Sequence, residues 1–278
     1  MTLVTLKDVL QPALADGYAV AGVVVLGWED ARAYVAAAEA EQCPLILQAG
    51  PGCRGHTPLP VLAAMFRHLA QQASVPIVAH LDHGYAADEC REAIDCGFTS
   101  VMFDGSKLPL ADNIAQTRAI AEMAHAAGVS CEGEIGYVGY AEGAASHGTD
   151  PGEAQRFAAE TGVDAMAISI GNVHLQQSKN AAVDEELLRS IEAVTNVPLV
   201  LHGGSGIPMK TRIDLARNSH ICKFNIGTEL RQVFGASLRS KMADDPQQFD
   251  RIALLSAVEE PLKHAARQIL RNLAKGDR

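Results

Sequence analysis

The sequence predicts one (β/α)8 barrel, a TIM barrel of the α/β class, with extra helices at its C-terminal end. Three observations support this prediction. Short runs rich in Val, Ile and Leu alternate with longer Ala-rich segments of helical period, eight such runs occur, and no linker or shift in composition divides the 278 residues. Because parallel strands need crossover helices, and because closure removes both edges of the sheet, eight β-then-α units fit one closed barrel.

The expected strands follow one another at regular intervals. They are 18–26, 44–49, 76–81, 100–104, 130–135, 164–170, 198–202 and 221–226. Helical patterns lie between them, for example over 29–41, 109–128 and 184–194, and several open with an acidic residue or Pro and close near Gly. We predict a single domain over 1–278, in which 247–278 forms a C-terminal helical extension of one or two helices.

A doubly wound open sheet is the structural alternative. An open sheet of this kind often carries a G-x-G-x-x-G motif after an early strand, and this chain has none. The closed barrel is therefore favoured.

The charge and composition of the chain exclude two classes of binding partner, nucleic acids and membranes. The formal charge is −10, from 33 acidic and 23 basic residues, and no block of consecutive Lys or Arg marks a surface for nucleic acid or anionic membranes. The first residues lack the pattern of a signal peptide, and no stretch approaches the roughly 18 uninterrupted apolar residues of a membrane span. We expect a cytoplasmic protein that binds neither nucleic acid nor membrane.

Six cysteines form no C-x-x-C pair, and in a cytoplasmic protein we expect them to be reduced. Most read as small core residues. Only Cys53, in the Gly- and Pro-rich stretch AGPGCRGHTP, has surroundings in which we expect exposure.

Polar side chains end consecutive strands of the predicted barrel. Active sites of such barrels lie at the C-terminal ends of the strands, so these residues share one mouth. In strand order they are Asp82 and His83, Asp104, Glu132 and Glu134, His174, His202, and Asn225. Chance placement would scatter them, so we predict the functional site at this mouth.

Three of these residues are histidines. A lone His at a strand end is usually a packing residue, but His83, His174 and His202 converge, and three imidazoles with an open fourth position form a catalytic Zn²⁺ site. Another divalent metal is the alternative. His80 lies an odd number of residues before His83, so strand alternation predicts that it points away and serves as structural support.

Asp82, beside a predicted metal ligand, has two interpretations. Its carboxylate can exchange a proton with a substrate hydroxyl while the metal polarises the neighbouring carbonyl. Alternatively, it can fix the tautomer of a metal-binding His.

Two Gly-containing turns follow the last strands, in LVLHGGSGIP and KFNIGTELR. Barrels frequently bind phosphate with the loops after strands seven and eight and the helix N-termini that follow them. The candidate phosphate-binding residues are Gly203, Gly204, Ser205, Asn225, Gly227 and Thr228.

Taken in order, HLDHG, EGEIGYVG, LVLHGGSGIP and KFNIGTELR resemble the class II, zinc-dependent ketose-bisphosphate aldolases, which include fructose- and tagatose-bisphosphate aldolases. The resemblance runs from roughly residue 5 to 235. It implies that His83, His174 and His202 bind the catalytic zinc and that Asp82 is the acid/base. It also implies that Glu142 moves a proton at the carbon that becomes nucleophilic, and that Asp104 and Glu134 hold a second metal position.

The resemblance further implies a reaction and its partners. The reaction is the reversible cleavage of a ketose phosphate or related hydroxy-ketone to dihydroxyacetone phosphate, or an analogue, and an aldehyde. A zinc-stabilised enediolate is the family's intermediate, so no Schiff-base lysine is needed; a Schiff base at Lys223 remains an alternative. The partners are a small sugar phosphate or hydroxy-ketone and other copies of the chain, in a homodimer or larger homo-oligomer.

Two positions depart from the family pattern. Val24, in AGVVVLGWED, stands where the family usually has Asn, and Leu175, in GNVHLQQSKN, stands where it usually has Gly after the second zinc histidine. These two differences bear on the substrate more than on the reaction, because the metal ligands and Asp82 are retained.

Two other functions are open. A barrel metallohydrolase usually carries an H-x-H pair after its first strand, and this chain has none there. A non-catalytic sugar-phosphate-binding protein on an aldolase scaffold would have little use for Asp82, and would bind metal without turnover.

Overall fold

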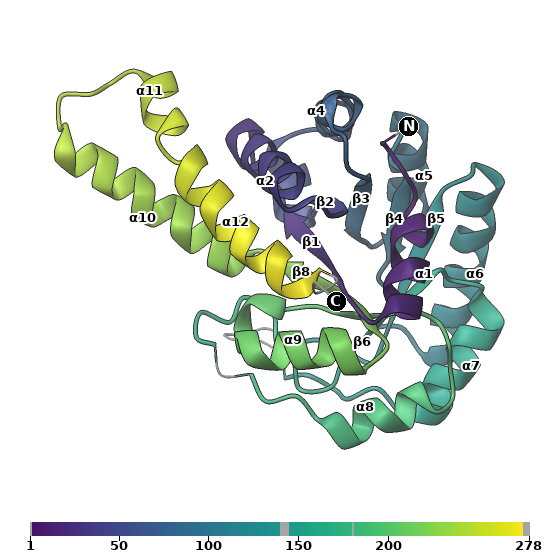
Figure 1. Cartoon of the computed structure of the whole chain (residues 1–278). Coiled ribbons are helices and arrows are strands. Elements are labelled where there is room, and N and C mark those ends of the chain that lie inside the picture. The colour runs from purple at the N-terminus through teal and green to yellow at the C-terminus, as the bar shows by residue number, and fades with distance from the viewer. Residues whose placement is uncertain (1, 140–144, 180, 275–278) are drawn as a thin grey trace.

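The computed structural model, shown in Figure 1, describes residues 2–139, 145–179 and 181–274. It contains eight parallel strands that close into a barrel in chain order, each paired with its neighbours and β8 with β1. The strands are β1 (Val20–Val24), β2 (Leu45–Ala49), β3 (Ile77–Gly84), β4 (Ser100–Phe103), β5 (Ser130–Ile135), β6 (Ala165–Ile168), β7 (Leu199–Leu201) and β8 (Ile221–Ile226). The predicted (β/α)8 barrel is confirmed.

Helices connect the strands and cover the outside of the barrel. They are α1 (Leu6–Asp16), α2 (Trp28–Glu41), α3 (Pro51–His56), α4 (Leu59–Gln72), α5 (Ala87–Cys96), α6 (Leu110–Ala126), α7 (Pro151–Thr161), α8 (Glu185–Glu192), the 3₁₀ turn η1 (Gly204–Gly206), α9 (Met209–Asn218), α10 (Thr228–Asp244), α11 (Arg251–Ser256) and α12 (Glu259–Leu273). Of the described helices, none is both long and apolar enough to cross a membrane.

Local sequence explains where several helices begin. The side chains of Asp150, Asp184 and Asp250 accept hydrogen bonds from free backbone N–H groups in the first turns of α7, α8 and α11. Helix α1 starts with a reciprocal capping box between Thr5 and Asp8. These caps fix the start of each helix and so the length of the loop before it.

The buried apolar residues form two clusters. The larger lies between the outward faces of the strands and the helices around them, and includes Leu47, Leu81 and Phe224. The smaller lies inside the barrel, where Leu6, Leu10 and other residues of α1 pack against inward-facing strand residues. Because the Lys7 backbone N–H also donates to Ser130 Oγ at the start of β5 (3.0 Å), α1 closes the N-terminal end of the barrel.

Above α1, the inside of the barrel holds a layer of buried polar side chains, here called the inner polar layer. Its members come from five strands: Gln48, His80, Ser100, Glu132 and Lys223. They lie between the apolar plug of α1 and the mouth of the barrel. The mouth side chains therefore rest on a polar floor.

The C-terminal extension begins later than predicted, at α11, and ends with α12. Helix α12 packs along α2, and Arg267 and Arg271 of α12 both bind the carboxylate of Glu41. In Figure 1, α10 and α11 project from the barrel as an arm, with α12 returning along it to the strands. The arm exposes the apolar side chains of Met242, Phe249 and Ile252.

Candidate active site

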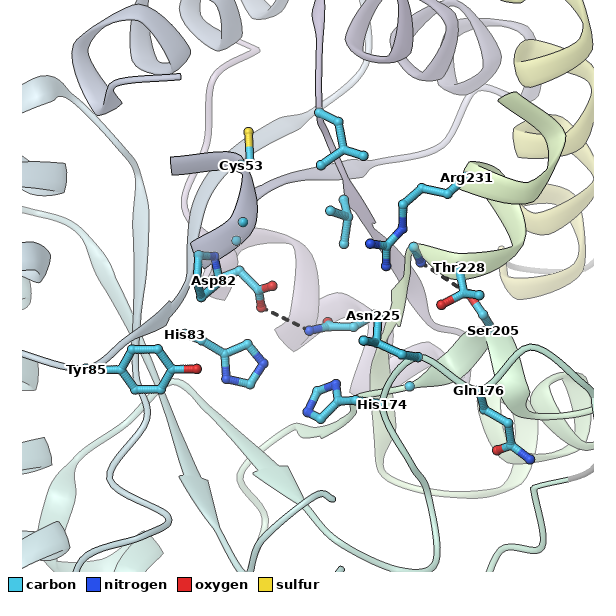
Figure 2. Close-up of a pocket in the computed structure, with 18 residues that line it drawn as sticks. Cys53, Asp82, His83, Tyr85, His174, Gln176, Ser205, Asn225, Thr228 and Arg231 are labelled. Carbon is cyan, nitrogen blue, oxygen red and sulfur yellow. Dashed lines mark hydrogen bonds between the residues drawn. The ribbon is translucent and has the colours of Figure 1, made fainter. Parts of the chain in front are cut away.

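The C-terminal ends of the strands surround a cavity of about 320 Å³. Figure 2 shows the side chains of Asp82, His83 and His174 pointing into it from one side, and Ser205 and Thr228 from another. The predicted site residues that line it are Asp82, His83, His174, Gly203, Ser205, Asn225, Gly227 and Thr228. Two of the three predicted zinc histidines and five of the six predicted phosphate-binding residues thus face a common space, whereas His202, Asp104, Glu134 and Gly204 do not line it.

An irregularity in β3 brings two consecutive side chains into this space. Along β3 and β4, Leu81 pairs with Val101 and Gly84 with Phe103, so β3 carries one extra residue, and His83 adopts a left-handed φ of 54°. Strand alternation predicted that His80 and His83 would point in opposite directions, and this is wrong. Because of the bulge, His80 points into the inner polar layer and His83 also points inward, above it.

The three predicted zinc histidines lie together. Their ring centroids are 5.2 Å apart for His83 and His174, 4.6 Å for His83 and His202, and 5.4 Å for His174 and His202. One nitrogen from each ring lies within 4.8 Å of the other two. His83 and His202 are buried and His174 is half-buried, so a bound ion would be reached from the cavity.

The inner polar layer orients His202. Its Nε2 lies 3.2 Å from Glu132 Oε1, while Lys223 Nζ donates to Glu132 Oε2 at 2.6 Å. A carboxylate accepts, so Nε2 carries the proton and Nδ1 is bare. Lys223 is fully buried and ion-paired below the mouth, outside the cavity lining, a placement that counts against the Schiff-base alternative.

His83 is oriented in the same way from β4. Its Nδ1 lies 2.9 Å from Asp104 Oδ2 and 3.9 Å from Glu134 Oε2. One nitrogen is thereby engaged with a carboxylate, as metal-binding histidines commonly are. His83, Asp104 and Glu134 also form a second group with metal-ligand spacing, which agrees with the position implied by the family resemblance.

Burial and the neighbouring charges move the pKa values of these groups apart. Burial lowers the pKa of His83, but the carboxylates of Asp82, Asp104 and Glu134 outweigh it and raise this pKa to about 9. Burial, reinforced by the charge of His83, lowers the pKa of His174 to about 4, and burial holds the pKa of His202 well below its usual range. Burial raises the pKa of Glu134 to about 8, with Asp104 adding to the shift.

Two buried atoms test whether a cation fits here. His202 Nδ1 and Glu134 Oε2 have no hydrogen-bond partner among the described residues, and they lie 3.4 Å from each other. Buried polar atoms are normally paired, since leaving one unpaired costs about 1–3 kcal/mol. A divalent cation among His83, His174 and His202 would coordinate the bare Nδ1, so the donor set fits the metal implied by the resemblance.

Asp82 is held by Asn225, from the opposite side of the barrel. Asn225 Nδ2 donates to Asp82 Oδ1 at 3.1 Å, and Figure 2 shows this bond across the cavity. Asp82 directly precedes His83 in the strand and lines the cavity, where its carboxylate can exchange a proton with a substrate hydroxyl. Asn225, expected at the phosphate, therefore also positions Asp82.

The two Gly-containing turns pack against each other. Ser205 Oγ accepts from the backbone N–H groups of Gly227 (3.2 Å) and Glu229 (3.3 Å), which join η1 to the start of α10. Gly203 has a φ of 66°, and a Cβ there would lie 2.1 Å from the Val173 carbonyl oxygen. A Cβ on the buried Gly204 would lie 3.0 Å from the Asn225 carbonyl oxygen, which is a tight contact. Glycine at both positions therefore allows the two turns to approach closely.

Several cavity residues were not predicted as site residues. Leu26, Tyr85 and Arg231 line the cavity together with Val24 and Leu175, the two departures noted above. Figure 2 shows the Arg231 guanidinium directed inward over the turn at Thr228. Arg231 lies three residues after Thr228 on α10, so both side chains are on the same face of the helix. That spacing could have identified Arg231 as a cavity residue from the sequence.

Two further expectations concern Cys53 and Glu142. Cys53 was expected to be exposed, and this is wrong: its side chain packs into the core beneath α3, where burial raises the pKa of the thiol to about 11. Such a thiol is a poor nucleophile. Glu142 lies outside the described residues.

Comparison with known proteins places this site in a family. The family model for class-II fructose-bisphosphate aldolase matches residues 4–278. A 6-phospho-5-dehydro-2-deoxy-D-gluconate aldolase from Bacillus licheniformis is 36% identical, over 96% of this chain and 95% of that protein. A fructose-bisphosphate aldolase from Geobacillus stearothermophilus is 35% identical, over 95% and 94% of the two chains.

Among solved structures, the YdjI aldolase from Escherichia coli K12 superposes with a TM-score of 0.86 at 30% sequence identity. The match covers 98% of both chains. The similarity therefore includes the extra C-terminal helices as well as the barrel.

Proposed function

The chain belongs to the class-II fructose-bisphosphate aldolase family and is an aldolase, and from this premise we propose its reaction. It reversibly cleaves a ketose phosphate, or a related hydroxy-ketone, into dihydroxyacetone phosphate or a close analogue and an aldehyde, and it depends on a divalent metal. One observation carries the proposal: His83, His174 and Asp82 line one cavity, the buried His202 lies against both of the other imidazoles, and the Nδ1 of His202 has no hydrogen-bond partner among the described residues.

His83, His174 and His202 would hold the metal, which we assign as Zn²⁺ because three neutral imidazoles and an open position are its typical catalytic ligands. Other divalent ions that bind imidazole are the alternative. Asp104 and Glu134, with His83, would form the second position. When bound, the ion supplies Lewis-acid stabilisation of negative charge on the substrate oxygen.

Asp82 moves the proton of the cleaved bond. In the cleavage direction its carboxylate takes the proton of the hydroxyl on the carbon that becomes the aldehyde. The C–C bond then breaks, and its electron pair stays with the ketone fragment. Glu142 is proposed to protonate that fragment at the former bond carbon, while Asn225 keeps the Asp82 carboxylate aimed into the cavity.

The turns after β7 and β8 would bind the phosphate of the substrate. Helix α10 begins at this side of the cavity, where Gly227 and Thr228 line it, and the positive end of the α10 dipole favours an anion. The residues proposed are Gly203, Gly204, Ser205, Asn225, Gly227 and Thr228. A phosphate here would place the substrate carbonyl toward the histidines.

We also propose that the protein is cytoplasmic and forms a homodimer or larger homo-oligomer. The exposed Phe249 and Ile252 on the helical arm support self-association. Light scattering of the purified chain tests it, and a monomer at all concentrations would contradict it.

The reaction is tested by removing the metal. A strong chelator should abolish cleavage, and added Zn²⁺ should restore it. Dihydroxyacetone phosphate and dihydroxyacetone are then offered with a panel of aldehydes, which tests the phosphate requirement and the aldehyde together. Full activity without metal, with trapping by borohydride, would indicate a Schiff base instead; metal binding without turnover would indicate a binding protein.

A further inference from the structure

The presence of Asp82 and His83 in one cavity depends on the bulge in β3. Before it, alternate residues point outward, and Ile77, Ala79 and Leu81 all belong to the outer apolar cluster. Regular alternation would send His83 outward with them. The extra residue between Leu81 and Gly84 turns His83 inward beside Asp82, so a proton carrier and a metal ligand can be adjacent in sequence.

This backbone conformation is unfavourable on its own. A φ of 54° at a residue with a Cβ is sterically unfavourable, and it persists only where surrounding groups hold it. The Gly84 carbonyl resumes pairing with the Asp104 N–H at 2.9 Å. The carbonyls of Asp82 and His83 lie within the bulge itself.

Arg54, on the short helix α3, donates to both of these carbonyls. Its Nη1 donates to the carbonyls of Asp82 (2.7 Å) and Ala49 (2.8 Å), and its Nη2 donates to the carbonyl of His83 (3.1 Å). Only 9% of its side chain is exposed. The guanidinium thus spans both bulge carbonyls and ties them to the end of β2.

Glu89 on α5 completes the arrangement. Glu89 Oε1 lies 3.5 Å from Arg54 Nη2, and Glu89 Oε2 accepts from the Tyr85 N–H at 2.7 Å. The guanidinium is therefore fixed from one side by carbonyls and from the other by a carboxylate that also holds the chain just after the bulge. Arg54 is not among the described residues that line the cavity, so it acts through the backbone.

We propose that Arg54 is a positioning residue that holds the β3 bulge and so keeps Asp82 and His83 on the same side of the strand. The proposal rests on the proposed function for its catalytic consequence, although the bulge exists without it. A lysine cannot replace Arg54, because one ammonium cannot reach three carbonyls in the fixed fork geometry of a guanidinium.

The test compares Arg54→Met and Arg54→Lys with a matched control, Arg217→Met, in the full chain. Arg217 also donates to two backbone carbonyls, of Leu273 and Ala274, but at the opposite end of the barrel. Three quantities are measured: the Co²⁺ or Zn²⁺ dissociation constant by competition with a chelator, kcat and KM at saturating metal, and hydrogen exchange of the Asp104 amide in metal-free protein.

Both Arg54 variants should bind metal on the order of 10–100-fold more weakly and lose at least about tenfold in kcat with little change in KM. The Asp104 amide should exchange at least about tenfold faster, because its acceptor Gly84 ends the bulge. The Arg217 variant should lose thermal stability while keeping all three values.

Two results would overturn the proposal: wild-type amide exchange in Arg54→Lys, or Arg54 and Arg217 variants that change in the same way. If the wild-type protein binds no metal, the proposed function fails, and amide exchange still decides the role of Arg54. If metal binds and turnover occurs but neither depends on Arg54, the positioning role alone fails.

Discussion

The inner polar layer and the mouth above it share strands β3, β5 and β8, and they differ in how their buried polar groups are satisfied. In the layer, Lys223 and Glu132 lie 2.6 Å apart, and His80 Nδ1 is 2.8 Å from Ser100 Oγ. At the mouth, His202 Nδ1 and Glu134 Oε2 have no hydrogen-bond partner within the described part of the chain. The paired groups of the layer are thus structural, whereas the unpartnered atoms at the mouth indicate a ligand site.

Gln48 shows that this inference needs a cavity as well. Both polar atoms of its buried amide lack a hydrogen-bond partner among the described residues, yet Gln48 is no part of the mouth, whereas His202 and Glu134 each lie in a ligand group with His83, which lines the cavity. It is packed so closely that a Cβ on Gly22 would lie 1.7 Å from its Oε1. Unpaired atoms indicate a site only where a ligand can reach them.

The largest expected effects come from substitutions of His83 and Asp82 at the mouth. His83→Ala should remove a metal ligand and abolish both metal binding and turnover. Asp82→Asn should keep the metal and lose about 10²–10⁴-fold in kcat, because general acid–base catalysis contributes that much. Metal content by elemental analysis, beside kcat, separates the two; loss of metal in Asp82→Asn would contradict the division of roles.

A second prediction concerns the loss of the Glu132 charge in the inner polar layer. Glu132→Gln should lower the free energy of unfolding by about 3–5 kcal/mol, because it leaves Lys223 charged and unpaired. It should also weaken metal binding about 10–100-fold, since the His202 Nε2–H loses its carboxylate. Calorimetry and metal competition measure the two effects.

The control for that variant replaces the ion pair by apolar groups. Glu132→Leu with Lys223→Met should recover much of the lost stability while metal binding stays weak. Recovery of both together would show that the layer affects the metal only through folding.

The third prediction concerns pH. Charged His83 stabilises the metal-free fold fully below its unfolded pKa, near 6.5, and that stabilisation is lost as pH rises through its folded pKa of about 9. Metal must displace this proton, so apparent metal affinity should rise about tenfold per pH unit up to about pH 9. Titration calorimetry in two buffers measures the released proton.

Asp104→Asn tests whether His83 sets this pH dependence of metal affinity. Without the carboxylate that accepts from His83 Nδ1, the pKa of His83 falls, and the rise in metal affinity should move to lower pH. An unchanged profile would assign the titration to a different group.

The smallest effect concerns Leu175, half-exposed at the rim, with a φ of 58°. Leu175→Gly relieves a left-handed conformation worth roughly 1–2 kcal/mol, partly offset by the entropy of glycine in the unfolded chain. The melting temperature should rise slightly, and KM for a phosphorylated substrate should fall several-fold as the backbone becomes accessible. Leu26→Ala is the control, because it removes an apolar rim residue without changing a strained backbone conformation. It should neither raise the melting temperature nor lower KM.

Much of this architecture was readable in the sequence, for identifiable reasons. Each of the eight strands was found because buried parallel strands are continuous apolar runs, and the strand-end residues followed from barrel geometry. The shared inward direction of His80 and His83 was not, because one inserted residue reverses the alternation between them and nothing in HLDHG indicates it. The pairing of Lys223 with Glu132 joins β8 to β5 across the barrel, a contact that strand-by-strand inspection does not contain.

In the described part of the chain, Leu6, Leu10 and their neighbours on α1 fill the N-terminal end of the barrel, and the mouth is its open end. We therefore expect metal, substrate and product to pass through the mouth. A substrate bound over the histidines would close that path, so we expect the proposed metal to bind before the substrate and a bound substrate to shield the ion from chelators.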